Sequence, residues 1–341
     1  MKPPPEQASS PESPGPAGRE YLRAQAGAGG ILSYRDFTAA ALYAPGWGYY
    51  ARAGARRVGR DRRADFYTAA SLGGGIFGQL LRVAAAALLA PENPADYTLI
   101  ELGAEPGVGV FGDEAAPFAR VETRRLGDPL GFPACAVIFA NELLDAQPFH
   151  RFVFRRGAWR ELGVQVDGPE LEELELPEFS PAARAAAAIL PADASEEQHL
   201  DWSLDAEALA RALASALERG LLIFADYGYD WRELTQERPA GTARAYRGHA
   251  ASRDLLAHPG EQDLTCHVCW DRIERALREG GCGETQVERQ EAFFARHAGL
   301  AIASLLARDA ERFSPARQTL LELLHPAHLG GIFQILWARR P

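Results

Sequence analysis

The sequence predicts an α/β protein whose strands run parallel in one sheet. Short apolar runs, each the length of one buried strand, lie at 97–102, 134–140 and 221–225. Each run has an acidic side chain at or just past its carboxyl end, in order Glu101, Glu142 and Asp226. Parallel strands bring these ends to one edge of the sheet, where open α/β sheets bind their ligands. The same three acids therefore predict the position of a site.

The segment before the first strand is predicted to be helical, behind a disordered tail. Residues 1–20 are rich in Pro, Ser, Gly and Glu and hold too little apolar surface to fold. A variant of the capping box opens a helix over 33–42, and a short extended piece is expected at 48–50. A longer helix is predicted over 71–90, where Pro91 ends it.

A hairpin and a helix are predicted between the second and third parallel strands. The runs 149–154 and 159–164 flank an Arg-Gly pair and indicate two antiparallel strands. Ser203 is the expected cap of a helix over 204–218, directly before the third strand. A last strand is expected at 332–337.

Composition excludes several classes of protein. With 46 Asp and Glu against 36 Lys and Arg, the chain has a net charge of −10, which argues against a nucleic-acid binder. No apolar run approaches the ~20 residues of a membrane span. Lys2 is the only lysine, which leaves none for Schiff-base or P-loop chemistry in the folded body. Four cysteines make no disulfide framework, and we expect a cytoplasmic protein.

Residues 161–178 hold seven Asp or Glu and neither Lys nor Arg. A solvated face or loop explains such a stretch, and so does a docking surface for an arginine-rich partner segment. Both interpretations stay open at this point.

A glycine-rich turn follows the first strand, from Glu101 through Gly103 and Gly107 to Gly109. Glycines after a strand let backbone approach a ligand closely. Methyltransferases carry an acid-x-Gly-x-Gly-x-Gly pattern here, whereas this chain places its later glycines two residues late and has Glu105 between them. The turn does not match the phosphate-binding Gly-x-Gly-x-x-Gly, which argues against a nicotinamide enzyme.

Polar residues also follow the other two strands. Asn141 and Glu142 are explained by a helix cap with a first-turn acid, or by a carboxylate that binds a cationic substrate. The same two interpretations apply to the Asp-Tyr-Gly run that begins at Asp226.

Histidines and cysteines near 249–282 have structural and chemical interpretations. His249 and His267 are either satisfied structural residues or general bases. Cys266 and Cys269 form one Cys-x-x-Cys pair, and its spacing to Cys282 fits no standard zinc finger, so we predict no metal.

Taken together, these motifs resemble the MidA-like methyltransferase family, whose mitochondrial members are complex I assembly factors acting on an arginine. The resemblance covers about 32–340. It rests on short matches in the same order, at 41–50, 64–69, 77–78, 101–103, 139–145, 148, 150, 226–228, 246–249, 259–260, 263–265 and 267–268.

The resemblance implies a Rossmann-like class I methyltransferase sheet, S-adenosylmethionine as donor, and a protein with an exposed arginine as acceptor. Glu142 and Asp145 would hold the guanidinium, with Asp226 in support. The residues implied around the cofactor are Glu101, Gly103, Gly107, Gly109, Glu122 and Asn141. Those implied on the substrate side, partly as a lid, are Tyr49, Asp65, Phe66, Thr68, His249 and Asp263.

On this basis the chain divides into a tail at 1–20, a helical lid segment at 21–95 and a methyltransferase domain at 96–341. Substrate-side elements are expected as an insertion at about 149–200. Only 37 residues, 104–140, separate Gly103 from Asn141. That leaves room for one strand at 119–125 and predicts that the helix after the glycine turn is lost or very short.

The shortened cofactor half supports a second hypothesis, a degenerate member that binds a partner protein as an assembly factor without catalysing methylation. The catalytic and the non-catalytic hypotheses differ in one structural expectation. Side chains of Glu105, Val110 or Phe111 filling the cavity at the strand ends would count against catalysis.

Overall fold

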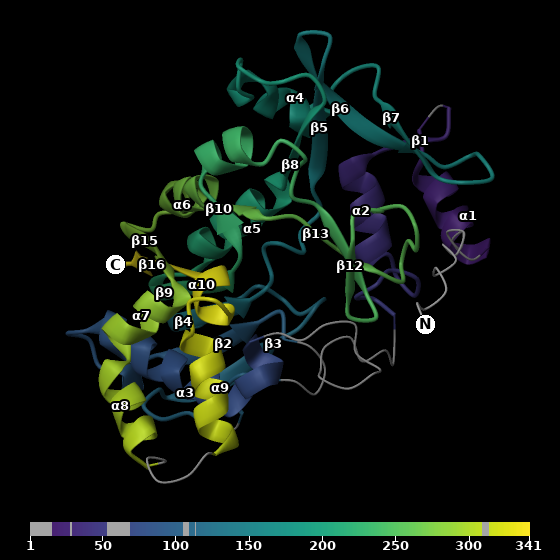
Figure 1. The fold of residues 1–341 in the computed structure, drawn as a ribbon. Coiled ribbons are helices and arrows are strands. Elements are labelled where there is room, and N and C mark those ends of the chain that lie inside the picture. Colours follow the sequence, from purple (N-terminus) through teal and green to yellow (C-terminus); the bar gives the residue numbers. More distant parts are fainter. Residues whose placement is uncertain (1–15, 28, 53–68, 105–108, 113, 309–313) are drawn as a thin grey trace, which may run out of the picture.

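The computed structural model describes residues 16–27, 29–52, 69–104, 109–112, 114–308 and 314–341. Within these ranges the chain forms a six-stranded sheet covered by helices on both faces, with a smaller five-stranded sheet beside it (Figure 1). None of the described helices combines the length and the apolarity needed to cross a membrane.

The large sheet has the strand order β15-β16-β9-β4-β2-β3. Its parallel strands are β2 (Thr98–Leu102), β3 (Arg120–Arg124), β4 (Cys135–Asn141) and β9 (Arg219–Asp226). On one side of the sheet, β16 (Gln334–Arg340) pairs antiparallel with β9, and β15 (Glu284–Arg289) pairs antiparallel with β16. The predicted parallel α/β sheet is confirmed, including the single strand expected at 119–125.

Alternation along the strands divides the core between the two faces of this sheet. Leu99, Val137 and Ile223 face α3 (Ala69–Leu89), together with α7 (Gln290–His297), α8 (Gly299–Arg308) and α9 (Pro315–Leu324). Ile100, Ile138 and Phe224 face α5 (Leu204–Ala216) and α6 (Trp270–Glu279). Each buried apolar side chain contributes about 1.5–3 kcal/mol, so both faces are needed to hold the sheet.

The smaller sheet carries the inserted elements. It consists of β1 (Ile31–Ser33), β5 (His150–Arg155), β6 (Ala158–Gln165), β7 (Glu172–Glu175) and β8 (Gln198–Trp202). The predicted hairpin is confirmed as β5 and β6. Strands β5 to β8 lie within the stretch 149–202, and the division of the chain with an insertion at about 149–200 stays a prediction. The N-terminal strand β1 pairs with β6, and α2 (Tyr34–Tyr43) packs against both, so the N-terminal segment and the insertion form one unit.

The remaining described elements are short. They are α1 (Pro16–Gln25), η1 (Pro94–Asp96), α4 (Pro181–Ala186), η2 (Ala187–Ile189), β10 (Gly228–Tyr229), η3 (Glu233–Glu237), β11 (Arg244–Arg247), β12 (Ala250–Ser252), β13 (Asp263–Thr265), β14 (Val268–Cys269) and α10 (Leu329–Ile332).

Two local predictions are wrong. Helix α1 begins at Pro16, so the predicted tail extends too far; its first fifteen residues lie outside the described part. The piece at 48–50 is a turn and not a strand. The N–H groups of Gly48 and Tyr49 donate to the carbonyls of Ala44 and Ala41, at 2.7 and 2.8 Å, and fold the chain back onto α2.

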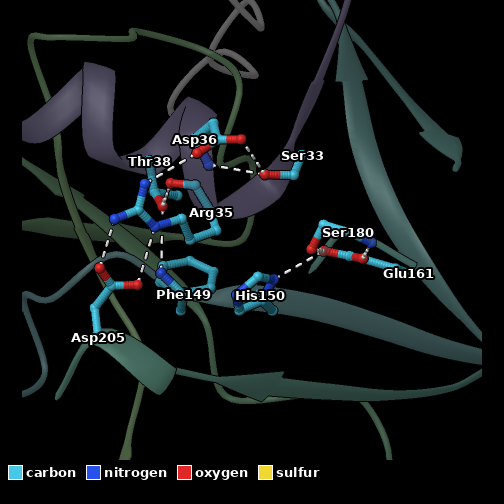
Figure 2. Close-up of polar contacts among 9 residues, drawn as sticks. All are labelled: Ser33, Arg35, Asp36, Thr38, Phe149, His150, Glu161, Ser180 and Asp205. Atoms are coloured by element: carbon cyan, nitrogen blue, oxygen red, sulfur yellow. Dashed lines mark hydrogen bonds and ion pairs between the residues drawn. The ribbon is translucent and has the colours of Figure 1, made fainter. Parts of the chain in front are cut away.

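Carboxylates of the acidic stretch 161–178 bind arginines of the chain itself. Glu173 and Glu175 pair with Arg151 and Arg155, both at 3.2 Å. Glu161 is buried. Its carboxylate lies within hydrogen-bond distance of the His150 ring on β5 and accepts the hydroxyl of Ser180, directly before α4 (Figure 2). These contacts favour a structural role for these acids over a docking surface.

Candidate active site

The register of the large sheet brings the predicted acids to one edge. Leu102 at the end of β2 lies opposite Ala140 of β4, and Asn141 of β4 lies opposite Ala225 of β9. The chain continues from β4 into Glu142 and from β9 into Tyr227, so the residues that follow the three strands share the carboxyl edge of the sheet. This is where a parallel sheet binds ligands.

Both carboxylate oxygens of Asp226 accept backbone N–H groups. Its Oδ2 accepts the N–H groups of Leu144 and Asp145, at 3.0 and 3.3 Å, and its Oδ1 accepts the N–H of Tyr227 at 2.9 Å. Burial, followed by the nearby Asp145 carboxylate, raises the pKa of Asp226 well above its ordinary value. Asp226 therefore shapes the turn after β4, which makes it a positioning residue.

Asp145 lies in the turn after β4 that Asp226 holds. Its side chain is buried, and its Oδ1 has no hydrogen-bond partner among the described residues. Burial raises the pKa of Asp145 to about 6, although the Tyr227 hydroxyl acts in the opposite direction by hydrogen bonding to it. A buried carboxylate with an unused oxygen is suited to accept a donor from a ligand.

Tyrosines from four segments surround this acid. Tyr43 on α2, Tyr50 in the following turn, Tyr227 after β9 and Tyr246 on β11 each have a raised pKa, because burial and then nearby carboxylates including Asp145 oppose a second negative charge. The Tyr43 and Tyr50 rings stack with centroids 5.6 Å apart. Aromatic faces beside carboxylates favour a cationic group.

Glu142 has an unusual backbone conformation. Its φ is +48°, in the left-handed region that non-glycine residues rarely adopt. The strain is held in place by its N–H, which donates to the carbonyl of Ala225 at 2.9 Å, and by Asn141, whose side-chain amide donates to the Glu142 carboxylate at 2.9 Å. Strained residues that a fold keeps are often functional.

The glycine turn after β2 is closed by Glu101. Its two carboxylate oxygens lie 3.1 and 2.9 Å from the N–H of Val110, which donates to them. Gly103 has φ +78°, and a Cβ there would lie 3.0 Å from Leu143. Gly109 lies beside Glu101, where a Cβ would be 3.6 Å from its carboxylate. Gly107 and Glu105 lie outside the described residues.

Helix α3 holds this loop in place. Arg82 is buried and donates to the carbonyls of Phe111 and Glu114, at 3.0 and 3.2 Å, and to the Glu114 carboxylate at 2.9 Å. The described part of the segment between β2 and β3, which leaves out 105–108 and 113, contains no helix. Val110 and Phe111 point into the core on the α3 side and pack there.

Glu122 is the weakest of the predicted cofactor residues. It pairs with Arg120 and Arg124 of its own strand, at 2.7 and 2.5 Å, which neutralise its charge. It lies opposite Ile100, two residues before β3 ends. Its role as a ribose-binding acid stays a prediction, with these contacts against it.

The residues predicted on the substrate side differ in their burial. Tyr49 is buried and packs its ring edge-on against Tyr50, with centroids 5.0 Å apart. Asp263 is buried on β13, whereas His249 lies exposed in the turn between β11 and β12 with φ +64°. Asp65, Phe66 and Thr68 lie outside the described residues.

His267 lies beside the site without joining a metal centre. Its ring stacks on Tyr229 with centroids 4.9 Å apart, and burial lowers its pKa to about 4. Cys266 and Cys269 are buried thiols with raised pKa values. Among the described residues, no group of three His, Cys, Asp or Glu is placed to hold a metal ion.

The N-terminal segment is attached to the large domain beside the site. Arg35 on α2 binds both carboxylate oxygens of Asp205 at the start of α5, at 3.0 and 2.6 Å (Figure 2). The hydroxyl of Thr38 accepts the N–H of Phe149 at 3.3 Å, and the hydroxyl of Tyr43 donates to the carbonyl of Ala146 at 2.9 Å. These contacts fix the tyrosines of this segment over the turn that carries Asp145.

Sequence reasoning missed Arg82 and Tyr43. A signal for Arg82 exists, because it is the one charged residue in the helix Ala69–Leu89. Tyr43 gave no separate signal, since its contact with Ala146 depends on how two distant segments pack.

Comparisons with known proteins agree with this geometry. A family model for S-adenosyl-L-methionine-dependent methyltransferases, Methyltransf_28, matches residues 127–286. The chain is 27% identical over 204 residues to "Protein arginine methyltransferase NDUFAF7, mitochondrial" of Mus musculus, which covers 58% of this chain and 44% of the relative. The Drosophila melanogaster homologue is 28% identical over 225 residues, with 62% and 48% covered. The match thus spans less than half the length of these curated relatives.

A solved structure matches over nearly the whole chain. It is a COG1565 superfamily member from Burkholderia thailandensis bound to S-adenosyl-homocysteine, with a TM-score of 0.79, 27% identity, and coverage of 97% of this chain and 95% of that one. Fold and site together define the class, a Rossmann-like α/β protein of the S-adenosylmethionine-dependent methyltransferase type. Within that class, the chain is similar to the MidA-like family.

Proposed function

We propose that this chain transfers a methyl group from S-adenosylmethionine to an arginine of a protein. The single observation that carries the proposal is the pair Glu142 and Asp145, which follow β4 directly and lie beside the tyrosines and the glycine turn. Relatives named as protein arginine methyltransferases support the choice of acceptor.

The cofactor fits the turn after β2. S-adenosylmethionine supplies an electrophilic methyl group on a sulfonium. Gly103 and Gly109 leave space there that a side chain would narrow. Asn141, at the end of the adjacent strand β4, has a buried side-chain oxygen that lacks a hydrogen-bond partner among the described residues. Glu101 shapes the turn through Val110.

The acceptor fits the acidic side of the edge. A guanidinium presents parallel N–H donors, and a carboxylate accepts two of them. Glu142 and Asp145 would hold the guanidinium so that one nitrogen points toward the cofactor, which is mainly a problem of orientation. The tyrosine faces exclude water around this cation and strengthen its contacts with the carboxylates.

A second candidate is a non-catalytic protein-binding assembly factor. It is favoured by one observation, that the carboxylates of Glu101 and Glu122 are both occupied by groups of this chain. Under this candidate the carboxylates of Glu142 and Asp145 would still bind an arginine of the partner, without methyl transfer.

The test is methyl transfer from radiolabelled S-adenosylmethionine to an array of arginine peptides, with the same peptides carrying lysine as controls. We expect label on arginine peptides only, and a loss of at least tenfold in Glu142→Gln. A peptide from a respiratory complex I subunit is the first acceptor to try, because the mitochondrial members of the family assist complex I assembly. Peptide binding without label transfer would favour the assembly factor.

A further inference from the structure

Asp145 differs from Asp226 and Glu142, the other two acids assigned to the guanidinium, in how its carboxylate oxygens are used. Its Oδ1 is buried without a hydrogen-bond partner. By contrast, Asp226 accepts three backbone N–H groups, and the Glu142 carboxylate accepts the Asn141 amide. A buried acceptor left unused costs free energy, about 1–3 kcal/mol, so packing alone does not explain it.

The turn holds this carboxylate rigidly. Asp226 fixes the backbone N–H of Asp145, and the Asp145 carbonyl accepts the N–H of Cys266 at 3.0 Å. The Tyr227 hydroxyl lies 3.1 Å from the Thr265 hydroxyl, so the neighbouring ring is anchored to β13. The backbone that carries this carboxylate is therefore held in place, and the side chain is buried.

The groups that face Asp145 come from every element around it and are acids or neutral groups. They are Glu142 on its own turn, Asp226 and Tyr227 after β9, Tyr43 on α2, Tyr50 in the turn after α2, Tyr246 on β11, and Asp263 and Cys266 on and after β13. A basic group that acts on this set is Arg244, which lowers the pKa of Tyr246 from the same strand.

We propose that Asp145 is the proton acceptor of the reaction, in addition to holding the substrate. This inference rests on the proposed function. A guanidinium nitrogen forms a bond to the methyl carbon, the carbon–sulfur bond breaks, and its electron pair stays on sulfur. The methylated guanidine would then carry one proton too many, and that proton passes from the attacking nitrogen to Oδ1 of Asp145.

The other two acids are less suited to this step. Both carboxylate oxygens of Asp226 already accept backbone N–H groups that hold the turn. Glu142 is half-buried and bound by Asn141. The raised pKa of Asp145, about 6, supports the assignment, since a base works best when its pKa lies near the working pH.

The experiment measures kcat as a function of pH for the wild-type chain, Asp145→Asn and Asp145→Glu on one arginine peptide. Calorimetric binding of S-adenosylhomocysteine is measured beside it. Asp193→Asn, on an exposed acid, is the matched control. We expect the wild-type kcat to fall on the acid side with an apparent pKa near 6. Asp145→Asn should lose about 10²–10⁴-fold in kcat, with no acid limb and unchanged binding. Asp145→Glu should recover part of the rate.

Two distinguishable results would overturn the role of Asp145 as proton acceptor. If Asp145→Asn keeps its kcat within threefold or keeps the acid limb, the proton goes elsewhere while the proposed function stands. If the wild-type chain binds S-adenosylhomocysteine but labels no arginine peptide, the proposed function fails and the role of Asp145 fails with it.

Discussion

Gly78 of α3 lies directly against the backbone carbonyl of Val110, so closely that a Cβ at position 78 would lie 2.1 Å from that oxygen. Val110 is also the residue whose N–H closes the glycine turn onto Glu101. Helix α3, which precedes β2 in sequence, therefore packs against the turn after β2 and restricts its conformation. In this chain α3 therefore supports residues 109–112 of the loop after β2.

This relationship predicts that Gly78→Ala weakens cofactor binding. The new methyl group would meet backbone, which cannot rotate away, so the 109–112 loop must shift. We expect S-adenosylhomocysteine affinity to fall at least tenfold by calorimetry, with an unchanged far-UV circular dichroism spectrum. Gly75→Ala is the matched control, because a Cβ at position 75 of the same helix meets nothing within 4 Å. That variant should keep its affinity and gain about 0.5–1 kcal/mol in stability. Equal affinities in both variants would refute the supporting role of α3.

The strained backbone of Glu142 predicts a conflict between stability and activity. Glu142→Gly removes the penalty of a left-handed conformation and should raise the free energy of unfolding by about 1 kcal/mol in urea titrations. It also removes a carboxylate from the site and should abolish arginine methylation. Glu197→Gly, at an exposed position with φ +62°, should keep full activity. A Glu142→Gly chain that methylates normally would contradict the role assigned to this acid.

Burial of Asp145 predicts how stability depends on pH. The folded chain retains a proton on this carboxyl between its ordinary pKa of 3.8 and the raised pKa of about 6, so the free energy of unfolding decreases as pH rises through this interval. Asp145→Asn carries no such charge. It should match the wild-type stability near pH 4 and exceed it at pH 8, by up to about 3 kcal/mol. A stability difference between the two chains that stays constant from pH 4 to 8 would show that Asp145 is not desolvated in solution.

The ion pair between Arg35 and Asp205 predicts that the N-terminal segment is energetically coupled to α5. The pair is bidentate but partly exposed, so the coupling energy should be modest, about 0.5–1 kcal/mol. A double-mutant cycle with Arg35→Met and Asp205→Asn, measured by urea unfolding, gives this energy. Additive effects of the two substitutions would mean that packing alone attaches the segment.

Much of this fold is predictable from sequence because its strands are simple apolar runs. The run at 134–140 and the acid after it predict both β4 and the place of Glu142 at the sheet edge. The capping box at 33–36 is equally local, and Ser33 does accept the N–H of Asp36. Such signals need no knowledge of distant residues.

The failures have non-local causes. The turn at 48–50 depends on hydrogen bonds back to α2, which a pattern of aromatic residues does not reveal. The ring of tyrosines around Asp145 depends on packing between segments more than 90 residues apart, of which the Tyr43 contact with Ala146 is one instance. The ion pairs of Glu122 are partly predictable from the sequence, because Arg120 and Arg124 lie on the same face of the strand.

The central claim is that the turn after β2 binds the cofactor at the edge that carries Asp145. Calorimetric titration of the purified chain with S-adenosylhomocysteine tests it most directly, with Gly103→Val as the variant and Gly131→Ala as control. Gly103 has φ +78° and lies against Leu143, whereas a Cβ at Gly131 meets nothing within 4 Å. The account predicts micromolar binding that Gly103→Val abolishes and Gly131→Ala keeps. A stable, folded wild-type chain that does not bind would contradict it.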